Sequence, residues 1–119
     1  LQKTKSTPGI NFNADTQKWE ITGSSYPENA SEFYSPVFNW MAQYMTDEKR
    51  AISLDFKIDY LNSSSIKFIS DIIDRLNKYA LSGKTVEVNW FHMDDDEDIK
   101  ELGEEFKEEV SYSFNIIEL

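Results

Sequence analysis

Three serine hydroxyls follow an asparagine in the segment Asn62-Ser63-Ser64-Ser65. A serine hydroxyl can accept a phosphoryl group, which brings about −1.5 to −2 charge at neutral pH. The segment stands between an alternating apolar run and a stripe of apolar residues at helical spacing, so we expect it to begin a helix. Backbone N–H groups at a helix N-terminus favour a phosphate. Asn and Ser are also common helix caps, so a plain cap and a phosphorylation site both remain open.

A second group that could do chemistry is the acidic run Asp94–Asp98 with His92 close by. Counted as an EF-hand loop from Asp94, positions 1, 3, 5 and 12 carry carboxylates, but position 6 is Ile99, where the sharp turn requires glycine. Acids in a first helical turn are stabilised by the helix dipole without a ligand. A metal-binding protein that uses Asp94–Asp98 therefore stays an alternative, and we expect no metal. His92 is expected to be an ordinary surface or edge residue.

The composition excludes several classes of site. The chain has 119 residues with no cysteine, one histidine and four glycines. Disulfides, zinc–thiolate sites and a cysteine nucleophile are therefore absent. The sequence contains no G-x-S-x-G, H-E-x-x-H or G-x-x-x-x-G-K-[ST] motif. We therefore expect a protein that is not an enzyme and that has no cofactor.

The negative charge is concentrated in one segment. Residues 94–109 hold ten acids and two bases, a formal −8 of the chain's −10. Clustered cations are absent, so nucleic acid is not an expected partner. No apolar run reaches the ~20 residues of a membrane span. The first residues lack the apolar stretch of a secretory signal, so a cytoplasmic protein is expected.

Hydrophobic periodicity predicts a single α/β domain over residues 1–119, with the order β-β-α-β-α-β-α-β. The sheet is expected to be mixed or mainly parallel, with about five strands and about three helices. The expected strands cover about residues 10–12, 19–22, 51–61, 85–91 and 112–117. The expected helices cover about residues 31–46, the segment from the serine cluster to about 80, and residues 95–110. The first two strands are expected to form a hairpin, and Gly83 is expected in the left-handed conformation beyond the second helix.

Some details of this prediction concern individual residues. Residues 23–29 are expected to form a loop. Pro36 lies either in an early turn of the first helix, or at the first position of a second segment that Ser35 caps. Alternation places Tyr60 on the same side of its strand as the apolar residues at 52, 54, 56 and 58. The third helix is expected to bury four residues: Ile99, Leu102, Phe106 and Val110.

The pattern of a strand, Asn-Ser-Ser-Ser and a helix resembles the STAS domains of anti-sigma-factor antagonists, whose hallmark is Asp-Ser-Ser-Gly. A closer resemblance is to the SiaC family of bacterial regulatory phosphoproteins, formerly a domain of unknown function. Four segments carry it. They are Ser6-Thr7-Pro8, Gly23-Ser24-Ser25-Tyr26-Pro27-Glu28-Asn29-Ala30, Tyr60-Leu61-Asn62-Ser63-Ser64-Ser65-Ile66-Lys67 and Glu101-Leu102-Gly103-Glu104-Glu105-Phe106.

The resemblance implies a non-enzymatic partner-switching regulator with a STAS-like fold. A protein kinase with a histidine-kinase-like ATPase fold phosphorylates it, and a PP2C-type phosphatase removes the phosphate. The unphosphorylated form binds and activates a diguanylate cyclase, which links the switch to cyclic-di-GMP and biofilm formation. Ser63 matches the family's phosphorylated threonine, with Ser64 and Ser65 as alternatives. A switch like the anti-sigma-factor antagonists, with a different effector, is also open.

The partner-binding surface is expected to gather around the phosphorylation site. Loops at the carboxyl ends of neighbouring strands lie close together. The residues expected on this surface are Tyr26, Glu28, Asn29, Tyr60, Asn62 and Ser63. The alternative for the loop residues is a structural role, with Pro27 fixing the turn. A further option is a scaffold whose acidic helix binds a basic partner without phosphorylation.

Overall fold

The computed structural model describes residues 1–46 and 50–119 and confirms the expected order of elements. The strands are β1 (Gly9–Asn13), β2 (Lys18–Ser25), β3 (Ile52–Leu61), β4 (Val86–His92) and β5 (Ser113–Glu118). The helices are α1 (Ala30–Tyr44), α2 (Ser63–Leu81) and α3 (Glu97–Glu108). Gly83 has φ +97°, so the left-handed residue after α2 is confirmed.

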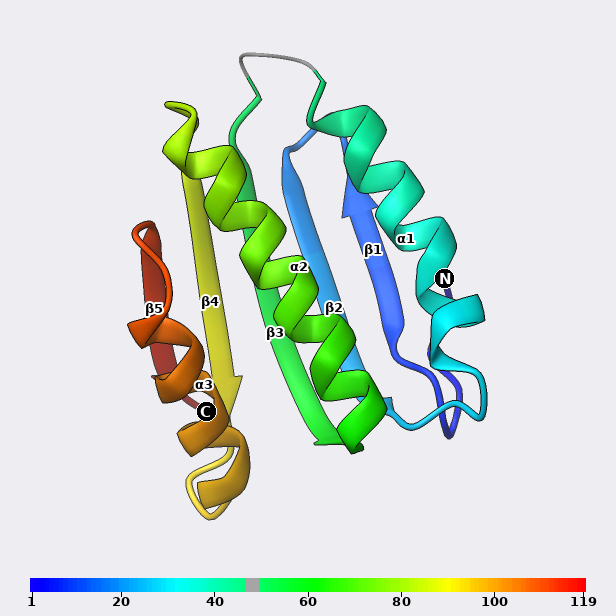
Figure 1. Cartoon of the computed structure of the whole chain (residues 1–119). Helices are drawn as coiled ribbons and strands as arrows, with labels where there is room; N and C mark the ends of the chain where they lie inside the picture. The colour runs from blue at the N-terminus through cyan, green and yellow to red at the C-terminus, as the bar shows by residue number, and fades with distance from the viewer. Residues whose placement is uncertain (47–49) are drawn as a thin grey trace.

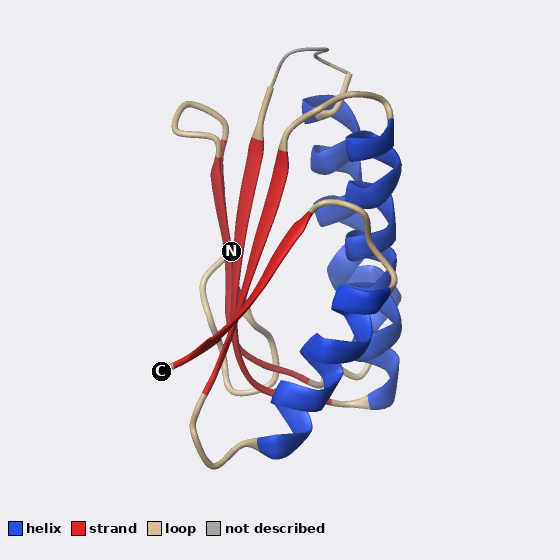
Figure 2. Ribbon diagram, turned by 90° about the vertical axis from the view of Figure 1, so that its left-hand side faces the viewer, coloured by secondary structure: helices blue, strands red, loops and turns tan. Residues whose placement is uncertain are grey.

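The five strands form one mixed sheet in the order β1-β2-β3-β4-β5. β1 is antiparallel to β2, which confirms the hairpin, and the other neighbours are parallel. All three helices cover the same face of the sheet (Figures 1 and 2). The core therefore lies in one layer between sheet and helices, and the starts of all three helices lie at the edge of the sheet where β2, β3 and β4 end.

The alternation of β3 holds until its last residues and then changes phase. Ile52, Leu54, Phe56 and Ile58 are buried against the helices. In the pairing of β2 with β3, Gly23 pairs with Ile58 but Ser24 pairs with Tyr60, which leaves one extra residue on β3. The prediction that Tyr60 shares the buried side is therefore wrong: this bulge turns Tyr60 outward, with 54% of its surface exposed, and buries Leu61.

The end of β2 also differs from the expected loop. Gly23–Ser25 continues the strand, and only residues 26–29 connect β2 to α1. Gly23 has φ +99°, a conformation that side chains rarely adopt, beside the irregular pairing. The backbone N–H of Asn62 donates to the carbonyl of Ser25 (3.1 Å), so the strand pairing reaches the start of α2.

Two of the helices correct details of the prediction. Pro36 lies inside the continuous helix α1, so the alternative with a second segment capped by Ser35 is wrong. In α3, Ile99 and Phe106 are buried and Leu102 is only partly buried, whereas the expected helix extends too far: Val110 lies beyond its end and is partly buried. Gly103 faces Trp90 so closely that a Cβ there would lie 2.3 Å from Cδ1 of the indole, so α3 can pack on the sheet only with glycine at this position.

The sheet face without helices carries polar side chains. Nδ2 of Asn89 donates to Oδ1 of Asp55 (2.9 Å), and Nδ2 of Asn115 donates to Oδ1 of Asn89 (3.0 Å). Lys57 pairs with Glu20 (3.5 Å) on the same sheet. Among the helices within residues 1–46 and 50–119, none is long and apolar enough to cross a membrane.

Candidate regulatory site at the start of α2

The three helices begin in the same way at the same edge of the sheet. Each is preceded by an Asn or Asp whose side-chain oxygen accepts a hydrogen bond from the backbone N–H three residues later. The caps are Asn29 to Glu32 (3.1 Å), Asn62 to Ser65 (2.9 Å) and Asp96 to Ile99 (3.1 Å). The first turns differ in charge: α1 contains Glu32, α3 contains Glu97 and Asp98, and α2 contains no acid.

The serines of the first turn of α2 have different environments. Ser63 and Ser64 are exposed, whereas Ser65 is fully buried. Oγ of Ser65 lies 2.7 Å from Oγ of Ser25, which in turn lies 2.6 Å from the hydroxyl of Tyr34. These three side chains form a buried hydroxyl chain that joins β2, α1 and α2. Two hydroxyls therefore face solvent at the helix N-terminus, and the third holds the helix in place.

The hydroxyl chain was not visible in the sequence. Ser25 and Ser65 are 40 residues apart, and Ser25 lies in the segment expected to be a loop. Burial raises the pKa of the Tyr34 hydroxyl, and its hydrogen-bonding partners Ser25 and Ser65 oppose the shift. Tyr34 therefore stays neutral and keeps its proton available for the chain. No motif in the sequence indicated this chain, because Ser25 was expected in a loop and its contacts with Tyr34 and Ser65 depend on the tertiary structure.

Two tyrosines form an exposed pair next to this helix start. The ring centroids of Tyr26 and Tyr60 lie 5.8 Å apart in a T-shaped arrangement. Tyr26 is 36% exposed and follows β2, while Tyr60 is placed outward by the bulge in β3. Exposed aromatic side chains are enriched in protein–protein interfaces. The structure therefore brings together Tyr26, Tyr60 and the α2 N-terminus, three of the features expected on one surface.

The other three residues expected on the partner surface are two helix caps and one exposed residue of a connection. Asn29 caps α1, and its Nδ2 donates to Oε2 of Glu32 (3.2 Å), so it has the structural role left open by the sequence. Asn62 is partly buried as the cap of α2. Glu28 is exposed in the connection between β2 and α1. All three belong to the edge of the sheet at which α1 and α2 begin.

The acidic run forms a turn, the cap and the first two residues of α3 rather than a calcium loop. Asp96 caps α3 and Ile99 is inside the helix, so the carboxylates do not converge as in an EF-hand. Within residues 1–46 and 50–119, no group of three His, Asp or Glu side chains is placed to hold a metal ion. His92 is buried, and its Nδ1 lies 2.8 Å from the carbonyl of Met93. His92 was expected to be an ordinary surface or edge residue; it ends β4, but its side chain is buried, so the expected exposure is wrong.

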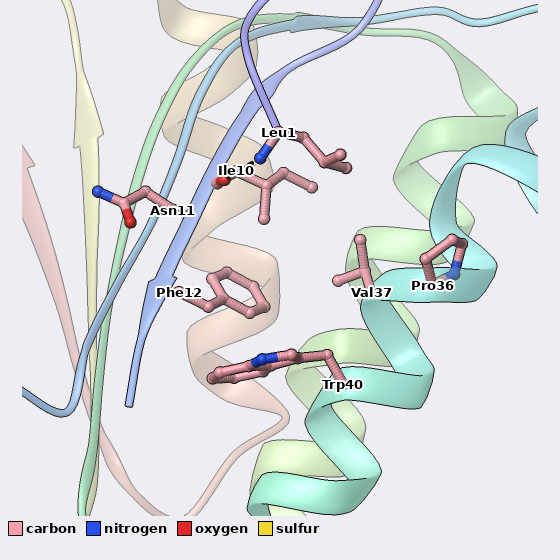
Figure 3. A pocket seen from close by; sticks show the side chains of 7 residues that line it. All are labelled: Leu1, Ile10, Asn11, Phe12, Pro36, Val37 and Trp40. Carbon is pink, nitrogen blue, oxygen red and sulfur yellow. Dashed lines mark hydrogen bonds between the residues drawn. The ribbon is translucent and has the colours of Figure 1, made fainter. Parts of the chain in front are cut away.

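An apolar hollow lies on the far side of the molecule from the acidic run, between β1 and α1 (Figure 3). It has a volume of about 340 Å³, and Phe12 and Trp40 form its wall with ring centroids 5.5 Å apart. Asn11 also borders it, but its side chain points away from the hollow (Figure 3). None of the side chains that line the hollow is charged.

The protein is a two-layer α/β domain, with a sheet covered on one face by helices and with exposed serines at one uncharged helix start. In the comparison with protein families, the whole chain, residues 1–119, matches the model of the SiaC family regulatory phosphoproteins. The chain therefore belongs to the SiaC family, a family of regulatory phosphoproteins and not of enzymes. The resemblance seen in the sequence is confirmed.

Proteins of known sequence and structure place the chain close to relatives in Pseudomonas aeruginosa. An uncharacterized protein of strain UCBPP-PA14 is 37% identical over 113 residues, which are 95% of this chain and 90% of that protein. The crystal structure of the diguanylate cyclase SiaD in complex with its activator SiaC matches with a TM-score of 0.95 and 35% identity, over 100% of this chain and 98% of that one. The apo-SiaC crystal structure matches with a TM-score of 0.91 and 36% identity, over 98% of this chain and 95% of that one. The expected α/β fold is thereby confirmed, whereas STAS-like remains a resemblance.

Proposed function

We propose that this protein is a phosphorylation-controlled partner switch whose switching group is the Ser63 hydroxyl. In the unphosphorylated state it binds and activates an effector in the cytoplasm, and we infer a diguanylate cyclase because a structurally similar SiaC is the activator of one. A kinase with a histidine-kinase-like ATPase fold adds the phosphate, and a PP2C-type phosphatase removes it.

The observation that carries this proposal is the uncharged, serine-rich first turn of α2. Its dipole favours a negative group, yet α2 alone of the three helices lacks an acid there. A phosphate on Ser63 would supply that charge without disturbing the buried chain, since Ser63 is exposed and Asn62 remains the cap. The domain can therefore keep its fold in both states.

The same geometry favours the exposed Ser63 and Ser64 over the buried Ser65. Ser65 is fully buried and its Oγ contacts that of the buried Ser25. A kinase would therefore have to open the start of the helix to reach it. Ser64 is exposed like Ser63, so burial does not distinguish these two serines. Ser63 is preferred because it matches the family's phosphorylated threonine.

The effect of the phosphate on binding follows from its hydration. The expected partner surface comprises Tyr26, Glu28, Asn29, Tyr60, Asn62 and Ser63. A partner that covers the Tyr26–Tyr60 pair would have to desolvate a dianion next to it, and an unpaired buried charge costs several kcal/mol. Each 1.4 kcal/mol changes affinity about tenfold, so one phosphate is enough to release the partner.

The test is to place phosphoserine at position 63 during synthesis and to titrate the cognate diguanylate cyclase by calorimetry, with cyclic-di-GMP formation as a second readout. We expect phosphoserine to weaken binding at least tenfold and to abolish activation. Phosphoserine at position 64 is the matched control and should have a smaller effect. Unchanged binding with phosphoserine at 63 would overturn the assignment.

The kinase step has its own test. After incubation with the kinase and ATP, the intact mass should rise by one phosphate in the parent protein and in Ser64→Ala, but not in Ser63→Ala. Phosphorylation of Ser63→Ala to the same extent would exclude Ser63. Binding of an effector without any change in cyclic-di-GMP would instead favour a switch with a different effector.

A further inference from the structure

A groove separates the start of α2 from α3 and has a volume of about 470 Å³. Its apolar lining comes from both sides: Leu61 and Ile66 flank the start of α2, and Ile99 and Leu102 belong to α3. The exposed Tyr60 borders it at the end of β3. The two helix starts are neighbours at the same edge of the sheet in Figure 1.

The charged residues that line the groove are all acidic. They are Asp59, Asp96, Asp98, Glu101 and Glu105. The ion pairs found within residues 1–46 and 50–119 involve other carboxylates, namely those of Glu20, Asp71 and Asp74. The groove therefore combines an apolar floor with a rim of carboxylates that the fold itself does not neutralise.

The spacing of the rim indicates the shape of the occupant. Asp98, Glu101, Leu102 and Glu105 recur at i, i+3, i+4 and i+7, so they share one face of α3 over two turns. A partner helix lying along α3 would place apolar side chains on the floor and basic side chains beside the carboxylates. Such docking of an amphipathic helix in a groove is a common recognition mode.

The geometry points to a second docking surface: the groove between α2 and α3 binds an amphipathic helix whose apolar stripe is flanked by Lys and Arg. Charge complementarity selects a basic partner, because an acidic or neutral helix would leave five carboxylates near its path uncompensated. This surface shares Tyr60 with the proposed effector surface, but it takes a different occupant, and its charges do not depend on phosphorylation of Ser63.

The two surfaces respond differently to a phosphate. Tyr60, Leu61 and Ile66 line the groove and bracket Ser63 in the sequence, so a phosphate on Ser63 adds negative charge close to one end of the groove. A basic helix in the groove is not repelled by this charge. Ser63→Asp is therefore expected to keep or strengthen binding of a basic helix, whereas it weakens the proposed effector.

The probe is a fluorescein-labelled 18-residue peptide with leucines at i, i+3, i+4 and i+7 and lysines or arginines elsewhere, titrated by fluorescence anisotropy. The groove variant is Asp98→Asn/Glu101→Gln/Glu105→Gln. The matched control is Asp15→Asn/Glu87→Gln/Glu118→Gln, which removes the same three charges from exposed positions elsewhere. We expect at least a tenfold loss of affinity for the groove variant and less than a threefold loss for the control.

Two outcomes would overturn the inference. An equal loss in both variants would mean that the peptide responds only to net charge. Equal binding of a peptide with the same composition in scrambled order would exclude an apolar stripe seated on the floor. Circular dichroism of each variant verifies that it is folded. Failure here leaves the Ser63 experiments unaffected, since these use a different partner and a different readout.

Discussion

The starts of α2 and α3 are built alike and charged differently. Both follow a parallel strand of the same sheet, and both have an Asx cap that binds the backbone N–H three residues on. The first turn of α3 carries Glu97 and Asp98, whereas that of α2 consists of three serines. A helix N-terminus is stabilised by negative charge. This charge is permanent in α3, whereas the first turn of α2 has none.

The charge at the start of α3 is fixed by its carboxylates, whereas the charge at the start of α2 would change if a serine there were phosphorylated. A carboxylate at the start of α2 would already occupy the position that a phosphate would take. Serines keep the position neutral, and the buried hydroxyl chain of Ser25, Tyr34 and Ser65 holds the turn without any charge. In α3 the position is filled, and the helix is held instead by the contact of Gly103 with Trp90.

The largest effect is expected where α3 meets the sheet. Gly103→Ala would force a methyl group to within 2.3 Å of a fully buried Trp90, so the helix must move away. Overpacking of this kind costs about 3 kcal/mol in the free energy of unfolding. Urea denaturation measures it, with Glu104→Ala at an exposed neighbouring position as the control. Equal stability of the two variants would mean that α3 is not held by this contact.

The next effect concerns the hydroxyl chain behind α2. Ser25→Ala removes the group that both Tyr34 and Ser65 contact and leaves their hydroxyls buried without it. We expect a loss of about 2 kcal/mol in the free energy of unfolding. Ser63→Ala, at the exposed end of the same turn, should change it by less than about 0.5 kcal/mol. Similar losses for both would show that the turn is not divided into a structural part and a free part.

Alkaline pH offers a smaller and continuous perturbation of the same chain. Burial raises the pKa of Tyr34 in the folded state, so the stability gained from its neutral form is complete below about pH 10, the ordinary tyrosine pKa. That stability is lost as the pH rises through the raised pKa. The melting temperature should therefore fall above pH 10.

The control for this prediction uses a second tyrosine. Burial also raises the pKa of Tyr112, whose hydroxyl donates to the carbonyl of Ile73 (3.2 Å), so Tyr112→Phe is the background variant. Tyr34→Phe in that background should flatten the decline of melting temperature between pH 10 and 11.5. An unchanged decline of the melting temperature would mean that the loss of stability at alkaline pH comes from a group other than Tyr34.

The smallest effect tests the charge difference directly. Ser64→Glu gives α2 the acid that the other helices have, and we expect a gain of about 0.5 kcal/mol at low ionic strength. Glu97→Gln in α3 should lose about the same amount, and both changes should fade in 1 M salt. Thermal denaturation measures each. A destabilised Ser64→Glu would show that repulsion from the neighbouring acids outweighs the helix dipole.

Much of the fold followed from periodicity, because the buried positions of strands and helices repeat regularly. The alternation of residues 52–58 was visible in this way. The bulge beside Gly23 was not, because a single extra residue leaves no trace in the pattern of β3. Pro36 was ambiguous because local rules oppose proline inside a helix, while the packing of α1 on the sheet overrides them.

The site was visible only in its local part. The residue types of Asn62–Ser65 indicated the start of a helix, and four short sequence segments indicated the family. The contacts of Ser25 with Tyr34 and Ser65 depend on tertiary structure, as does the pairing of Tyr26 with Tyr60. Sequence alone therefore indicated which hydroxyls were present, and the structure distinguished the exposed ones from the buried one.

The order of the strands has a consequence for how the protein forms. Each strand pairs with the one made just before it, so the sheet can grow in the direction of synthesis without waiting for a distant segment. Ser25, Tyr34 and Ser65 all belong to the first part of the chain, in β2, α1 and α2. All the residues that support the serine turn thus precede β4 and the acidic helix in the chain, so the contacts of this turn with its support require neither of the later elements.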